Sequence, residues 1–133
     1  AEENILGYQI DKYHAEDILV HEFAHSIHLI GILTVYPDFN ERLKKAYDAA
    51  LAGVEDAKRV VRAAQTGNIQ AEGAQDWFNV NAEVPKPDGK HNQVNTRKEL
   101  KAYDRGLYDI LSEFFPATNE QISCHKYINK YRK

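Results

Sequence analysis

His21-Glu22-Phe23-Ala24-His25 lies inside an apolar run, residues 18–30, that is followed by Gly31. The apolar residues around this stretch predict a helix over residues 15–30, closed by Gly31. Residues four positions apart on an α-helix differ by only about 40° in direction, so both imidazoles project from one face, one turn apart. The two histidines can therefore share one tetrahedral Zn²⁺ ion.

Glu22 starts on a neighbouring face of this helix. From there its carboxylate can reach a water molecule in the open position of the metal, where a general base for hydrolysis has to stand. In zinc peptidases the two histidines of the pattern HExxH bind the metal and its glutamate is the general base. We therefore expect Glu22 to be catalytic and His21 and His25 to bind zinc. A structural helical protein without metal, in which the pattern occurs by chance, is an alternative.

His28 lies one turn beyond His25. The longer metzincin pattern requires glycine at that position and a histidine at position 31, where this chain has Gly31. The metzincin pattern is therefore excluded. We expect His28 to pack in the protein or to support the ligands rather than to bind metal.

Composition and charge are those of one small domain. The chain has 133 residues, of which 43% are hydrophobic and 28% charged, enough for one core and too few for two. The net charge is −3, and basic residues are scattered except in the tail of residues 126–133, so we expect neither nucleic acid nor an anionic membrane as a partner.

We also expect no apolar stretch of transmembrane length and no signal-like N-terminus. Cys124 is the single cysteine, which excludes an internal disulfide and leaves the compartment open.

The rest of the pattern predicts mostly helices. Residues 4–8 are expected to form a short strand or extended segment. Pro37-Asp38 is typical of a helix start, and apolar spacing continues from there to a helix end near Gly53. Residues 54–64 are expected to form a third helix or a continuation, broken by residues 66–68. Another helix is expected over residues 71–80.

Residues 81–95 form the one long irregular stretch, and a loop of that size in a small domain is usually functional or mobile. Thr96 and Glu99 then form a capping-box pattern, which predicts a helix that continues through Phe114 and is stopped by Pro116. A short amphipathic segment is expected over residues 119–131.

A zinc site needs a third protein ligand. Downstream carboxylates occur in the blocks of residues 71–78 and 111–115, and spacing alone does not choose between them. The order of several blocks, however, resembles that of the gluzincin-type zinc metallopeptidases related to the catalytic domain of anthrax lethal factor. The blocks run over nearly the whole chain and comprise residues 4–8, 11–13, 18–28, 71–81 and 94–100.

This resemblance implies a mainly α, or α+β, zincin-like domain over residues 1–133, with at most a small N-terminal β element. It implies two motif histidines and a glutamate from a second helix as ligands of Zn²⁺. The ligand glutamate of this family lies four residues before the glutamate of the Ala-Glu-Gly block, which is Asn68 here. Asparagine offers a neutral oxygen and weaker ligation than a carboxylate. Glu72, one turn later, is expected to support the ligands or to become the ligand itself, and Glu113 is a further alternative.

The family also carries a tyrosine, one or two turns before the ligand glutamate, that stabilises the oxyanion. The matching position is near Val61, which cannot donate a hydrogen bond, whereas Tyr47, Tyr103 or Tyr108 could substitute from elsewhere. Losing one oxyanion donor lowers turnover by about two to three powers of ten.

Zincin domains also hold a peptide substrate against an edge strand before the motif helix. Either upstream strands are missing here, or a partner chain supplies them, or the sheet is minimal.

Two functional hypotheses follow. The first is a zinc-dependent peptidase that hydrolyses peptide or protein substrates by metal-activated water, with Glu22 as general base. The second is a catalytically impaired relative with the same fold that acts as a binding or structural protein, because Asn68 and Val61 depart from the family pattern. The resemblance favours a secreted protein in both cases.

Overall fold

The computed structural model describes residues 2–53, 66–88 and 91–117. Within these ranges the chain is mainly helical, as expected, and it contains no strand. The elements are α1 (Glu2–Leu6), α2 (Ile18–Ser26), a π-helical segment η1 (Ile27–Ile32), α3 (Leu33–Val35), α4 (Phe39–Gly53), α6 (Thr66–Trp77), α7 (Arg97–Tyr103) and α8 (Arg105–Ser112). The finer class, a zincin-like domain, stays a prediction.

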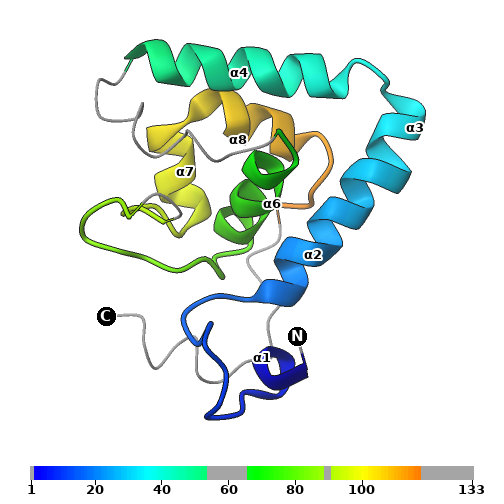
Figure 1. Cartoon of the computed structure of the whole chain (residues 1–133). Coiled ribbons are helices and arrows are strands. Elements are labelled where there is room, and N and C mark those ends of the chain that lie inside the picture. The colour runs from blue at the N-terminus through cyan, green and yellow to red at the C-terminus, as the bar shows by residue number, and fades with distance from the viewer. Residues whose placement is uncertain (1, 54–65, 89–90, 118–133) are drawn as a thin grey trace.

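Helix α6 lies at the centre of the molecule, with α2 along one side, α4 across its end and α7 and α8 on the other side (Figure 1). It packs against all four of these helices. The core between them contains buried apolar side chains from all five of these helices, among them Ala24, Phe39, Leu43, Ala71, Ala74, Trp77, Leu100, Leu107, Ile110 and Leu111. Because α6 is held on several sides, the polar side chains it turns toward α2 have fixed positions.

The motif helix begins three residues later than predicted and ends later too. Asp17 is its N-cap, and the Asp17 carboxylate accepts from the backbone N–H of Val20 at 3.1 Å. Gly31 does not close the helix, contrary to the prediction, because its φ is not positive and the helix continues through η1 and α3. Continuing the helix buries Ile32 in the core. The helix stops only at Tyr36, whose backbone (φ −126°, ψ 79°) leaves the helical region, which is disfavoured directly before Pro37.

The continuous helical run Ile18–Val35 is long and apolar enough to cross a membrane by length and composition alone. The expectation that no stretch reaches this length was therefore wrong, because it assumed a helix end at Gly31. One such helix is weak support for a membrane span. The absence of a membrane partner stays a prediction.

The N-terminal segment is helical rather than extended, so the expected strand over residues 4–8 was wrong. The side chain of Asn4 is buried and donates to the Asp11 carboxylate at 2.9 Å and to two backbone carbonyls at 3.0 Å. Its carbonyl oxygen accepts from the N–H of Ile18 at 2.9 Å. Gly7, with φ of 67°, ends α1. These bonds tie α1 to the start of the motif helix and leave no extended backbone for a strand.

Two other helix boundaries also differ from prediction. Residues 66–68 form the first turn of α6 instead of a break. The helix that Thr96 caps is interrupted at Asp104, whose backbone leaves the helical region and whose carboxylate accepts from the N–H of Leu107 at 2.8 Å to start α8. The predicted segments 54–64 and 119–131 lie outside the described residues, as do Val61 and Cys124.

Candidate metal centre

The two motif histidines converge on one point. Nε2 of His21 and Nε2 of His25 are 3.2 Å apart, and the rings meet edge to face with their centroids 4.9 Å apart. Two nitrogens bound to one tetrahedral zinc ion at about 2.0–2.1 Å would be about 3.3 Å apart. The spacing therefore fits two ligands of a single zinc ion.

The surroundings of His25 favour the neutral form of its ring. Burial lowers the pKa of His25, the neighbouring His21 lowers it further, and the Glu22 carboxylate partly opposes the change. The lowered pKa favours the neutral imidazole, which is the form that binds metal. Glu22 is exposed on the same helix, where a water molecule and a substrate can reach it.

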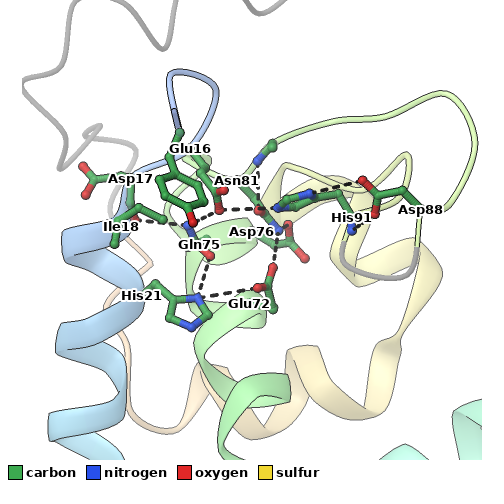
Figure 2. Close-up of polar contacts among 12 residues, drawn as sticks. Glu16, Asp17, Ile18, His21, Glu72, Gln75, Asp76, Asn81, Asp88 and His91 are labelled. Atoms are coloured by element: carbon green, nitrogen blue, oxygen red, sulfur yellow. Dashed lines mark hydrogen bonds and ion pairs between the residues drawn. The ribbon is translucent and has the colours of Figure 1, made fainter. Parts of the chain in front are cut away.

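The other nitrogen of His21 faces α6. Nδ1 of His21 lies 2.9 Å from Oε1 of Gln75 and 3.6 Å from Oε1 of Glu72 (Figure 2). Burial raises the pKa of Glu72, and His21 and His91 oppose that rise. Because Glu72 lies on the Nδ1 side, away from the nitrogen that faces His25, its position suits orientation of His21. Its role as a metal ligand stays a prediction.

Asn68, the predicted third ligand, is exposed in the first turn of α6. That turn lies against the motif helix, since a methyl group placed on the adjacent Gly67 would be 3.5 Å from Nδ1 of His25. Within the part of the chain that the structure describes, no three His, Cys, Asp or Glu side chains are grouped so as to hold a metal ion. The donor set there is thus two histidines, to which Asn68 or water would have to be added.

The other side chains considered from sequence have different partners. Glu113 forms an ion pair with Arg42 of α4. His28 is buried, its Nε2 donates to Oδ1 of Asn40 at 2.7 Å, and its ring packs edge-on against Phe39, which confirms the predicted packing role. Tyr108 packs on Trp77 at 5.0 Å, and Tyr103 is exposed. Tyr47 lies on α4, and a substitute for the oxyanion tyrosine stays a prediction.

Behind His21 lies a buried polar network that the sequence did not reveal. Nε2 of Gln75 donates to Oε2 of Glu16 at 3.2 Å and to the carbonyl oxygen of Asp17 at 3.1 Å. Nε2 of His91 lies 3.4 Å from the same Glu16 oxygen, and this contact raises the pKa of His91. Gln75 and His91 are 59 and 75 residues from Glu16, so no local pattern could have paired them.

The network continues to a second buried carboxylate. Nδ2 of Asn81 donates to Asp76 at 2.8 Å and lies 3.4 Å from Oε2 of Glu72. Burial raises the pKa of Asp76 well above its ordinary value, and the hydrogen bond from Asn81 opposes this only in part. The irregular stretch 81–95 is thus packed into the site at Asn81 and His91.

Comparison of the chain with models of protein families, with curated proteins and with solved structures finds no match.

Proposed function

We propose that this protein is a zinc-dependent peptidase of the gluzincin type, with His21 and His25 as zinc ligands and Glu22 as general base. The observation that carries the proposal is the 3.2 Å separation of the two Nε2 atoms, which suits one tetrahedral ion. The lowered pKa of His25 and the acceptors next to Nδ1 of His21 support it further, because histidine ligands need both neutrality and an oriented ring.

Zinc bound at this position would polarise a water molecule and the carbonyl of a peptide bond. Glu22 would take a proton from that water and deliver it to the leaving amine. Gln75 and Glu72 would keep the ring of His21 in place. Asn68 is the side chain proposed to complete the donor set from the first turn of α6.

The metal content of the natively purified protein, measured before any chelator or added metal, is the first test. About one zinc per chain is expected. A protein that contains no metal and takes up none on zinc titration would refute the site.

Glu22→Gln tests the mechanism. The variant should keep its zinc, because Glu22 is not a ligand, and should lose about 10²- to 10⁴-fold in hydrolysis of denatured proteins and peptides. Glu41→Gln removes an exposed carboxylate from α4 and serves as the matched control with unchanged activity. Undiminished hydrolysis in Glu22→Gln would exclude Glu22 as the base.

A catalytically impaired binding protein with the same metal site is the second candidate. It is favoured by one observation: among the described residues no group of three His, Cys, Asp or Glu side chains is arranged to hold a metal ion. Cleavage that is lost on chelation and regained with zinc would reject this candidate. Bound zinc without any cleavage across a broad peptide screen would support it.

Asn68→Glu tests whether residue 68 faces the metal, a point on which both candidate functions depend. A carboxylate at this exposed position supplies the anionic donor that zinc prefers, and the N-terminus of a helix tolerates the charge. Zinc affinity should rise in this variant and stay near wild type in the neutral control Asn68→Gln. Equal affinity in both variants would show that residue 68 does not face the metal.

A further inference from the structure

The amide of Gln75 can take only one orientation in its buried site. Gln75 is fully buried on α6. Its Nε2 faces two acceptors, the Glu16 carboxylate at 3.2 Å and the Asp17 carbonyl at 3.1 Å. A flipped amide would aim its oxygen at these two acceptors, and the repulsion between acceptors forbids that arrangement. Oε1 of Gln75 must therefore face His21.

This orientation fixes the proton on His21. Its Nδ1 has only acceptors in front of it, the Gln75 oxygen at 2.9 Å and the Glu72 carboxylate at 3.6 Å. Nδ1 must therefore carry the hydrogen and donate it. In the neutral ring Nε2 is then left with a free lone pair, and this is the nitrogen that faces His25.

We propose that Gln75 is the positioning residue of the metal centre, holding His21 in the tautomer whose Nε2 lone pair is ready for the metal. The inference rests on the proposed zinc site. Because Nε2 of His21 is an acceptor, the 3.2 Å contact between the histidines is a hydrogen bond donated by Nε2 of His25 in the metal-free protein. Zinc held by both Nε2 atoms would require the proton of His25 to be on Nδ1 instead of Nε2, whereas the proton of His21 would stay on Nδ1.

Gln75 is coupled to the loop over residues 81–95 through one carboxylate. Glu16 accepts from Gln75 and also lies 3.4 Å from Nε2 of His91. Figure 2 shows His91, Glu16, Gln75 and His21 in one connected set. The chain from Glu16 through Gln75 to His21 is what makes the ring orientation independent of the metal.

Nitrogen NMR of the histidine rings in the metal-free wild-type protein tests the inference directly. At about pH 8, where ordinary histidines are neutral, His21 is expected to carry its proton on Nδ1 and His25 on Nε2. After zinc is added, the His21 tautomer is expected to stay and that of His25 to change. A His21 ring protonated on Nε2 would overturn the inference, and this measurement needs no variant to fold.

Gln75→Met removes both hydrogen-bonding atoms of the side chain at similar size. His21 should then populate the Nε2-protonated tautomer in the metal-free protein, and zinc affinity should fall by about 10- to 100-fold. Gln70→Met is the matched control, because Gln70 is a fully buried glutamine of the same helix whose amide has no hydrogen-bond partner among the described residues. It should leave both the tautomer and the affinity unchanged.

The outcomes separate this inference from the proposed function. A wild-type protein that binds no zinc overturns the proposed function and with it the role of Gln75 in binding. Zinc binding together with an unchanged His21 tautomer in Gln75→Met overturns the inference alone. A changed tautomer with reduced zinc affinity, absent from the Gln70 control, supports both.

Discussion

Two glycines of α6 should respond in opposite ways to the same substitution by alanine. Alanine in a helix is favoured over glycine by about 0.5–1 kcal/mol where the site has room. At Gly67 the added methyl group would lie 3.5 Å from Nδ1 of His25, an ordinary contact distance. Gly67→Ala should therefore stabilise the protein by up to about 1 kcal/mol.

At Gly73 the same methyl group has no room. It would lie 2.9 Å from Cδ2 of Leu107 and 3.0 Å from Cδ1 of Leu111. Both leucines are buried in the core, so they cannot turn outward without opening it. Overpacking of this kind costs about 1–3 kcal/mol, which outweighs the helix preference. Gly73→Ala should therefore be destabilised by roughly 0.5–2 kcal/mol.

Urea unfolding of the two variants and the wild type measures the contrast. With a slope of about 1–3 kcal/mol per molar urea, the midpoints of the two variants should differ by roughly 1 M, one on each side of the wild type. The slope should not change. Midpoints that move in the same direction would refute the packing of α6 between α2 and α8, and with it the position of Gln75 and Glu72 behind His21.

Three further outcomes test the core and the buried network. Leu111→Ala, which empties a nearly fully buried position, should lower the free energy of unfolding by about 2–5 kcal/mol in urea unfolding. Asp76→Asn should stabilise the protein at pH 7, because burial raises the pKa of Asp76 and makes its charged form costly in the folded state. This gain in stability should shrink as the pH falls toward about 4, where the wild-type carboxyl becomes protonated in both the folded and the unfolded state. Thermal unfolding of the two proteins across this pH range measures the difference. The Glu16 contact raises the pKa of His91. The stabilising effect of this contact is therefore present below the ordinary histidine pKa of about 6.5 and is lost as the pH rises through the raised pKa. The stability difference between the wild type and His91→Gln should fall with rising pH in the same way, and a difference that grows with pH would contradict this expectation.

The spacing of residues was enough to predict the helix that carries His21 and His25. His21 and His25 lie on one face because a helical turn is 3.6 residues, and apolar neighbours are enough to indicate the helix. The N-cap of Thr96 is likewise a local hydrogen bond, at 3.2 Å to the N–H of Glu99. Such features depend only on residues within a turn of one another.

Helix ends were harder to predict, because tertiary contacts override local preference. Gly31 resembles a helix stop in sequence, yet burial of Ile32 carries the helix past it. Asn4 lies in a segment with strand-like apolar residues, but its side chain bonds to residues 7 to 14 positions away and makes the segment helical. In both places the free energy of burial or of a distant hydrogen bond exceeded the small local propensity.

The sequence by itself determined that His21 and His25 lie next to each other, because helix periodicity alone brings these two rings together. Only the tertiary structure decided which side chains contact the other nitrogen, Nδ1, of His21. Gln75 is 54 residues from His21 and reaches it because α6 packs against α2. Its amide orientation, and hence the proton on His21, depends on Glu16 from a loop that precedes the motif helix. Hydrogen bonds between such distant residues have no period in the sequence, since they exist only after the core has folded.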